Sequence, residues 1–333
     1  MALIEVEQLR KTFRVPVRHS GRLSAVRTLL SREYRDVHAV EEASFSIQAG
    51  ELVGYLGPNG AGKSTTLKML TGILVPSSGS ITVDGRVPHR QRSEHARSIG
   101  VVFGQRTQLW WDLPTIESFE LLRHIYAIPA ERWRSNLATF TELLELEPFL
   151  NTPVRQLSLG QRMRADLTAA LLHDPRILFL DEPTIGLDVL ARERIRGFLQ
   201  HLHRDLGVTI ILTTHDLGDI ERLCQRVILI DHGLVIYDGA LAALRTRLGR
   251  WRTLVIDLDE LPPEPITIAD AQVMRTEGLR VWLRFDREQI TAAALIATVA
   301  AYYSIRDLTV EEPAIESIVH TIYANGIGHN TNL

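Results

Sequence analysis

The sequence predicts an α/β fold built on a parallel sheet, followed by a smaller α+β domain. Two observations support the main domain: strand-like and helical segments alternate along residues 52–230, and the strand-like segments are almost continuously apolar. Such strands are buried on both faces of a sheet that helices cover. The third observation is a change of pattern after Gly249, where strand-like segments flank the chain-breaking stretch "LPPEP". In parallel sheets of this kind, ligands bind at the carboxyl ends of the strands.

Length and composition allow a full hydrophobic core. The chain has 333 residues, of which 45% are hydrophobic, enough for one large and one small domain. Its 37 basic and 40 acidic residues give a net charge of −3, so no nucleic-acid partner is expected. The single cysteine, Cys224, cannot form an intrachain disulfide, and the N-terminus lacks a signal-peptide pattern. Both features predict an intracellular protein, and no stretch reaches the roughly 18 apolar residues of a membrane span.

Each element rests on one of two periodicities. Alternating or continuous apolar residues indicate strands, and apolar residues three to four positions apart indicate helices. Strands are expected at residues 4–9, 43–47, 52–56, 81–83, 99–103, 177–180, 208–213 and 227–230. Helices are expected at residues 63–71, 116–125, 132–146, 162–172, 191–205 and 218–225. The main domain would end at residue 245, and domain 246–333 would hold strands 254–258 and 281–285 and helices near 287–301 and 314–323.

The stretch "GPNGAGKST" satisfies the phosphate-loop pattern G-x-x-x-x-G-K-[ST], and it lies where a predicted strand meets a predicted helix. Its glycines let the backbone wrap around a phosphate chain, so that N–H groups and the positive helix end point at it. Lys63 would reach the terminal phosphates, and Ser64 would bind Mg²⁺. The pattern predicts a P-loop NTPase whose nucleotide-binding residues are Gly57, Pro58, Asn59, Gly60, Ala61, Gly62, Lys63, Ser64 and Thr65.

The strand in "ILFLDEP" is a second nucleotide element. It delivers Asp181 to the carboxyl edge of the sheet, where the carboxylate can bind the metal through water. Glu182 follows it and can orient or deprotonate an attacking water. Alone, an acidic pair after an apolar strand is more often a cap or a solvated turn. Beside a phosphate loop, the pair indicates nucleotide hydrolysis.

Together these motifs resemble the ATPase subunit of an ABC transporter, and the resemblance covers about residues 3–240. It implies an ABC ATPase fold with an antiparallel β edge on the parallel core sheet and a helical subdomain at about 106–172. It also implies that ATP and Mg²⁺ are bound. His215, which ends the strand "VTIILTTH", would contact the γ-phosphate, whereas a strand-end histidine of purely structural role is the alternative.

Two further residues take roles from the resemblance. Phe13 would stack on adenine, with core packing as the alternative. Gln105, in "VVFGQRTQLWWDLP", would touch Mg²⁺ and sense a membrane subunit, with Gln108 as the second candidate. Trp110 and Trp111 follow, and they would help to anchor that subunit unless they pack in the core.

The stretch "LSLGQ" resembles the family signature LSGGQ, with Leu159 in place of a glycine. Ser158, Gly160 and the helix starting near Gln161 would bind the γ-phosphate held by the phosphate loop of a partner subunit. Asp188, in "GLD", matches the loop that crosses between subunits. A monomer would therefore be nearly inert. Leu159 is compatible with this role if its position needs neither positive φ nor phosphate contact, although a bulky interface side chain would slow closure.

The resemblance implies a cycle. Two copies close around two ATP molecules, Glu182 promotes hydrolysis, and loss of the shared charge opens the homodimer. Gln105 and the helices after it would pass this motion to separate transmembrane permease subunits, which places the chain at the cytoplasmic face of the cell membrane. The stretches "GYLGPNGAGKSTTLKMLTGIL" and "EEPAIESIV" resemble ABC-2-type exporters, in the branch of viologen or drug export. The alternatives are a soluble ABC-type ATPase acting on ribosomes or DNA, and an importer ATPase.

Residues 14–37 form a predicted basic insertion between the first two strands. Residues 10–35 hold one acid, Glu33, against the basic residues Arg10, Lys11, Arg14, Arg18, Arg22, Arg27, Arg32 and Arg35. A short apolar face amid the arginines suits contact with lipid headgroups and consists of Leu23, Val26, Leu29 and Leu30. A solvated excursion near the nucleotide and a contact with the membrane subunit are the other interpretations.

Overall fold

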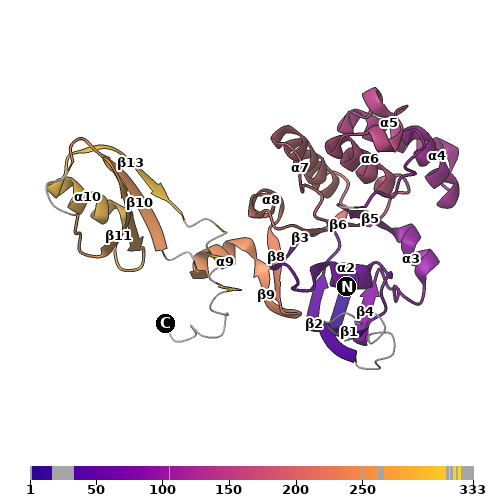
Figure 1. Ribbon diagram of the computed structural model, residues 1–333, viewed down its shortest axis with the longest axis horizontal. Helices are drawn as coiled ribbons and strands as arrows, with labels where there is room; N and C mark the ends of the chain where they lie inside the picture. The colour runs from indigo at the N-terminus through magenta and orange to yellow at the C-terminus, as the bar shows by residue number, and fades with distance from the viewer. Residues whose placement is uncertain are drawn as a thin grey trace, which may run out of the picture. The chain divides into compact units, whose positions relative to one another are not determined.

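The protein is described from a computed structural model (Figure 1). The structure describes residues 2–16, 34–104, 106–248, 251–261 and 266–312, together with residues 315, 318, 319, 322 and 323. The chain divides into two compact units, Met1–Asp238 and Gly239–Leu333. The division lies before the sequence boundary of 245, because helix α9 (Leu241–Leu248) groups with the second unit.

The first unit is built on a nine-stranded sheet with the strand order β4-β1-β2-β9-β8-β3-β7-β6-β5. Its strands are β1 (Ile4–Pro16), β2 (Tyr34–Ile47), β3 (Leu52–Leu56), β4 (Ser78–Val83), β5 (Ile99–Phe103), β6 (Ile177–Asp181), β7 (Thr209–Thr213), β8 (Arg226–Asp231) and β9 (Leu234–Ala240). Strands β8, β3, β7, β6 and β5 pair in parallel, whereas β1 pairs antiparallel with β2 and β4. The predicted parallel core sheet with an antiparallel edge is confirmed.

Helices cover the parallel strands, so that every residue of β3 and β7 is buried. The helices of this unit are α2 (Lys63–Leu70), α3 (Arg92–Ser98), α4 (Thr115–Ile125), α5 (Ala130–Leu144), α6 (Leu159–Leu171), α7 (Val189–Arg204) and α8 (Leu217–Leu223). Two 3₁₀ turns, Glu147–Phe149 and Val154–Gln156, lie between α5 and α6. In Figure 1, α4, α5 and α6 gather on one side of the unit, away from β1, β2 and β4. They occupy the segment for which the resemblance implies a helical subdomain.

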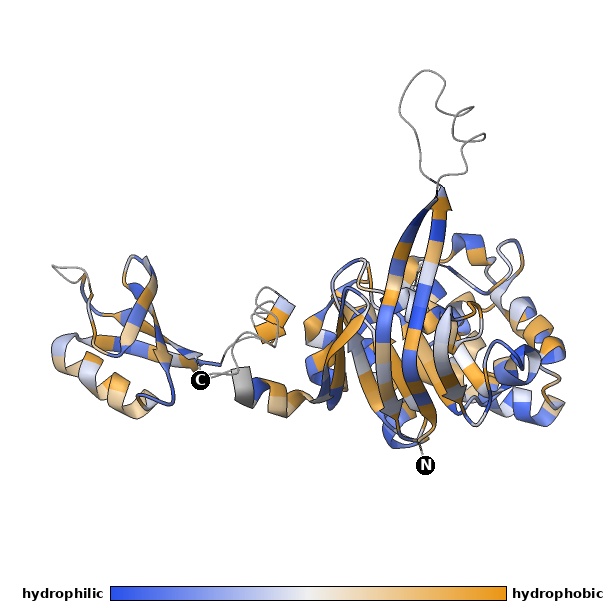
Figure 2. Cartoon of the chain, turned by 90° about the horizontal axis from the view of Figure 1, so that it is seen from below, coloured by the Kyte–Doolittle hydropathy of each residue, from blue (hydrophilic) through white to orange (hydrophobic). Residues whose placement is uncertain are grey.

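Strands β1 and β2 are longer than the sequence predicts, and they form a hairpin that runs past the other strands (Figure 2). Residues 14–16 and 34–37 of the predicted insertion belong to this hairpin. Cross-strand pairs explain the extension, since Phe13 lies opposite Val37, and Arg14 lies opposite Asp36. The Arg14 and Asp36 side chains also pair at 3.8 Å. The proposed lipid-facing residues of 17–33 lie outside the described residues.

The second unit contains a four-stranded antiparallel sheet in the order β11-β12-β10-β13. Its elements are β10 (Trp251–Leu258), β11 (Ala271–Glu277), β12 (Arg280–Asp286), α10 (Ala292–Tyr302) and β13 (Ile305–Glu311). Leu295 and Val299 of α10 pack in one core with Leu254 and Leu283 of the central strands. Strands β11 and β13 were not predicted, because these edge strands lack a continuous apolar pattern. None of the helices in the described ranges is long and apolar enough to span a membrane.

Candidate functional site

A pocket of about 640 Å³ lies at the carboxyl ends of the parallel strands of the first unit. Phe103 ends β5, Asp181 ends β6, and His215 follows the end of β7. The residues that line the pocket are Asn59, Ser64, Lys68, Ile73, Phe103, Gly104, Arg106, Asp181, Glu182, Ile185 and His215. The structure thus brings five of the predicted site residues, from three segments distant in sequence, to one pocket.

The phosphate loop is held closely by neighbouring strands. Gly62 caps the N-terminus of α2 with φ of 104°, a conformation that other residues rarely adopt. A Cβ atom at Gly62 would lie 2.4 Å from the carbonyl oxygen of Ala39 on β2. A Cβ atom at Gly57 would lie 2.4 Å from the carbonyl oxygen of Ile230 on β8. Glycine is therefore required at both positions for the loop to sit between β2 and β8.

Lys63 lies at the centre of this loop. Its side chain is buried, and Nζ donates to the carbonyl oxygens of Gly57 at 2.5 Å and Pro58 at 3.1 Å. Burial lowers the pKa of the Lys63 ammonium, and the carboxylates of Glu182 and Asp181 act in the opposite direction. The amine is thus a cation fixed among loop carbonyls and acids, which suits a point contact with a phosphate chain.

Asp181 joins the phosphate loop to the end of β7. Its Oδ1 atom accepts hydrogen bonds from Ser64 Oγ at 3.3 Å and from Thr213 Oγ1 at 2.6 Å. Thr213 was not among the predicted residues, although it is the direct neighbour of Asp181 in the parallel pairing of β6 and β7. The hydroxyl run in "TTH" was the available signal, but only the strand register shows which hydroxyl faces the acid.

These oxygen atoms fit a magnesium ion that arrives with a nucleotide. Mg²⁺ prefers oxygen ligands, and it is commonly held by one or two protein groups together with substrate phosphates and water. Ser64 Oγ and Asp181 Oδ1 provide such a pair at the base of the pocket. Within the described ranges, no cluster of three or more His, Cys, Asp or Glu residues could hold a metal ion by itself. The donor set therefore suits a shared ion rather than an all-protein metal site.

Glu182 is placed by an uncommon backbone conformation. Its φ is 55°, in the left-handed region, while its N–H donates to the carbonyl oxygen of Thr213 at 2.9 Å. Such conformations persist only where the surrounding structure enforces them, and they concentrate at functional sites. The turn puts Glu182 Oε1 at 3.3 Å from Nδ1 of His215, whose side chain is 58% exposed. The carboxylate and the imidazole thus face the same pocket.

Other predicted residues lie elsewhere. Phe13 does not line the pocket. It pairs across the strands with Val37, two residues before Ala39. The carbonyl group of Ala39 lies against Gly62 of the phosphate loop. Gln105 lies outside the described residues. Its second candidate, Gln108, uses its side-chain Nε2 to donate to the carbonyl oxygen of Asp166 at 3.0 Å. That bond directs Gln108 toward helix α6.

The signature stretch forms the start of α6, three residues before the predicted start of that helix. Ser158 and Gln161 make a capping box: Gln161 N–H donates to Ser158 Oγ at 3.2 Å, and Ser158 N–H donates to Gln161 Oε1 at 2.9 Å. Leu159 therefore takes part in a regular helix, so the position does not need the freedom of a glycine. None of the residues that line the 640 Å³ pocket comes from 157–161, which lies within the described ranges.

Asp188 has a local partner, because its Oδ1 atom accepts from the N–H of Ala191 at 2.8 Å and caps α7. Like the signature stretch, it is not among the residues that line the pocket. The next two residues, Val189 and Leu190, are apolar yet 81% and 79% exposed.

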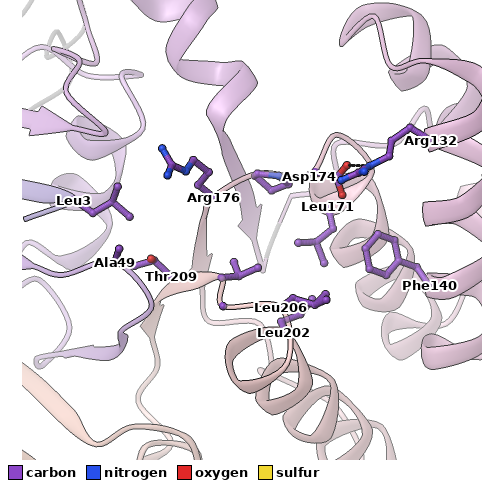
Figure 3. Close-up of a pocket in the computed structure, with 13 residues that line it drawn as sticks. Leu3, Ala49, Arg132, Phe140, Leu171, Asp174, Arg176, Leu202, Leu206 and Thr209 are labelled. Atoms are coloured by element: carbon purple, nitrogen blue, oxygen red, sulfur yellow. Dashed lines mark hydrogen bonds and ion pairs between the residues drawn. The ribbon is translucent and has the colours of Figure 1, made fainter.

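A second pocket, of about 390 Å³, lies at the opposite ends of the same strands (Figure 3). Its lining is largely apolar and includes Phe140, Leu171 and Leu202. Two charged residues at its rim, Arg132 and Asp174, pair with each other, as the dashed line in Figure 3 shows.

Comparison with known proteins identifies a family. The family model of ABC transporters matches residues 40–185. The chain is 37% identical to the ABC transporter ATP-binding protein NatA of Bacillus subtilis, over 64% of this chain and 88% of NatA. It is 40% identical to the Nod factor export ATP-binding protein I of Burkholderia orbicola, over 65% of this chain and 70% of that protein.

A solved structure shows the same fold. It is the dimeric ATP-binding cassette MJ0796, in a post-hydrolysis state bound to ADP and Pi, with a TM-score of 0.60 and 28% sequence identity. The match covers 72% of this chain and 98% of that one.

Proposed function

The chain belongs to the ATP-binding proteins of ABC transporters and is an ATPase; from that premise we propose that two copies close around two MgATP molecules to power an exporter. The observation that carries the proposal is the separation of two sets of residues. Ser64, Asp181, Glu182 and His215 converge on one pocket, whereas the signature stretch 157–161 lies outside it. Each set then serves a different nucleotide.

Within the pocket, the residues of this chain have distinct roles. Lys63 and the N-terminus of α2 bind the phosphate chain, and Ser64 and Asp181 hold Mg²⁺. When bound, Mg²⁺ neutralises charge that develops on the phosphates. Glu182 orients a water molecule and accepts its proton, and His215 donates a hydrogen bond to the γ-phosphate. Outside the lining of this pocket, Phe13 is proposed to stack on adenine, and Gln105 is proposed to contact Mg²⁺.

A second copy would complete the site. The first turn of α6 offers backbone N–H groups and the positive end of the helix, with Ser158 as its cap. Ser158, Gly160 and Gln161 would cover the γ-phosphate bound by the partner. Val189 and Leu190 would be removed from water in such a contact, which supports an interface beside Asp188.

We infer export as the direction of transport from the relatives, one of which is a Nod factor export protein. Trp110 and Trp111 are 39% and 50% exposed, which suits contact with a separate permease subunit at the cytoplasmic face of the membrane. An importer ATPase with an all-β appendage fits less well, because α10 packs on the sheet of the second unit.

Glu182→Gln tests the proposed function. The variant keeps the shape of the side chain but cannot accept a proton, so we expect hydrolysis to fall by about 100-fold or more while ATP remains bound. The dimer should then accumulate in gel filtration with MgATP. Glu120→Gln, an exposed change on α4, serves as the matched control and should behave as the wild type. A variant that stays monomeric under these conditions would show that Glu182 does not activate the water.

A further inference from the structure

Three buried polar residues outside the pocket form one hydrogen-bonded group, the Thr184–Arg196–Asp219 triad. Their exposed fractions are 3%, 9% and 0%. Thr184 Oγ1 donates to Asp219 Oδ2 at 2.5 Å, and Arg196 Nε donates to Asp219 Oδ1 at 2.6 Å. Arg196 Nη2 also pairs with the same oxygen atom. Both carboxylate oxygen atoms of Asp219 thus accept hydrogen bonds inside the protein. None of the roles proposed above involves this residue.

The triad residues follow the proposed hydrolytic residues closely in sequence. Thr184 follows Glu182 by two residues, and Asp219 follows His215 by four. Arg196 belongs to α7, the helix that Asp188 caps. The three side chains therefore join the loop after Glu182, the first turn of α8 after His215, and α7, which begins at the proposed dimer interface.

A second pair strengthens the same link. Asp216, the residue after His215, accepts from Arg192 Nη1 of α7 at 2.5 Å. Its other oxygen atom accepts from the N–H of Asp219 at 3.3 Å and caps α8. Arg192 and Asp216 thus connect α7 both to the residue after His215 and to the first turn of α8.

A buried ion pair is a poor source of stability, because apolar residues of the same volume often stabilise a core as well or better. What the pair does provide is a fixed geometry, since the planar guanidinium binds a carboxylate in few orientations. We propose that the Thr184–Arg196–Asp219 triad is a positioning device that sets the placement of Glu182 relative to His215 and couples both to α7. This inference rests on the proposed function of those two residues.

Thr184→Val tests the inference, because valine keeps the shape of threonine and removes only the hydroxyl donor. We expect kcat for ATP to fall about tenfold while KM stays within about twofold, because small misplacements of reacting groups lower the rate far more than they lower binding. Arg222→Ala is the matched control. It removes an exposed pair with Glu193 at 2.7 Å between the same two helices, and it should leave kcat unchanged. A Thr184→Val protein with the kcat of the wild type would overturn the proposal.

A double variant separates positioning from stability. Arg196→Met with Asp219→Leu replaces the ion pair by apolar packing. The midpoint of thermal melting should therefore lie near that of the wild type. The hydrogen bond that Thr184 Oγ1 donates to Asp219 is lost in this variant, so kcat should be about tenfold lower than in the wild type. If the double variant has both the melting midpoint and the kcat of the wild type, the triad only stabilises the fold.

Hydrogen exchange provides a readout that does not depend on hydrolysis. In the ATP-bound Glu182→Gln protein, Thr184→Val should raise exchange at residues 182–188 and 215–219 about tenfold, with little change in β3. Unchanged exchange in both loops would reject the positioning role even if the wild type proved to be inactive. If the wild type does not hydrolyse ATP, the proposed function is wrong, whereas the exchange result still tests the positioning role.

Discussion

Two pockets of the first unit lie at opposite ends of the same parallel strands, but they differ in how their charged groups are used. At the carboxyl ends, Ser64, Asp181, Glu182 and His215 face the 640 Å³ space beside the Lys63 ammonium. At the amino ends, the 390 Å³ space is lined largely by apolar side chains. Its charged groups form pairs with acids: Arg132 with Asp174, and Arg176 with Asp84.

The difference follows from the construction of a parallel sheet. Each strand ends at the same edge, and the loops after β3, β6 and β7 can each place a polar group there. At the other edge, the strands begin, and the chain arrives from the C-terminal ends of helices that pack through apolar residues such as Leu171 and Leu202. The convergence of polar groups, and not the presence of a cavity alone, thus identifies a pocket as a candidate site.

The largest expected effect is that of Lys63→Ala. The variant removes the buried ammonium, so we expect ATP affinity to fall by at least about 100-fold, since charge-assisted contacts to phosphate are among the strongest in proteins. Calorimetric titration with MgATP measures the change directly. An unchanged affinity would remove the distinction between the two pockets.

Arg176→Ala is the matched control for this prediction. It removes a cation from the rim of the opposite pocket, where Nη1 pairs with Asp84 Oδ1 at 3.0 Å. ATP affinity should stay within about twofold of the wild type, because the Arg176 side chain is 71% exposed and does not line the nucleotide pocket. A large loss here would show that charge anywhere on this unit, and not the phosphate loop, determines binding.

Much of the first pocket could be predicted because its residues occur at fixed spacing within single segments. A phosphate loop of nine residues and an Asp–Glu pair at a strand end can be predicted from the sequence alone. The bond from Thr213 to Asp181 was not predictable, since it depends on the register between β6 and β7. The same holds for Thr184 and Asp219, which are 35 residues apart in sequence.

The second unit shows a different limit. Strands β10 and β12 were predicted because they are central and bury apolar residues, such as Leu254 and Leu283. Strands β11 and β13 lie at the edges of the sheet and expose most of their residues, so their sequences carry little periodic signal.

Asp166 is a buried acid that lines neither of these two pockets. It is 5% exposed and accepts from Thr107 Oγ1 at 2.8 Å, and burial raises its pKa to about 6. Because the folded pKa lies above the ordinary value of about 4, this acid favours folding at low pH, and the contribution is lost as pH rises through 6. Asp166→Asn should therefore be more stable than the wild type at pH 7.5, by about 2 kcal/mol.

Urea unfolding at two pH values checks this prediction. The advantage of Asp166→Asn should shrink to less than half at about pH 4.5, where the wild-type acid is protonated in the folded state. ATP affinity should not change, because the residue does not line the nucleotide pocket. A stability gain that is the same at both pH values would mean that hydrogen bonding, and not burial of charge, explains the effect.

The smallest expected effect is that of Arg132→Ala, at the opposite pocket. The Arg132 side chain is 61% exposed, so its ion pair with Asp174 is screened by solvent. Asp174 also keeps a hydrogen bond from Asn136 Nδ2 at 2.9 Å, which holds the carboxylate when the arginine is removed. We expect a loss of about 0.2–1 kcal/mol in the free energy of unfolding, measured in urea, with unchanged ATP affinity. A fall in ATP affinity would instead indicate that the amino ends of the strands communicate with the phosphate loop, and the two pockets would then form one system.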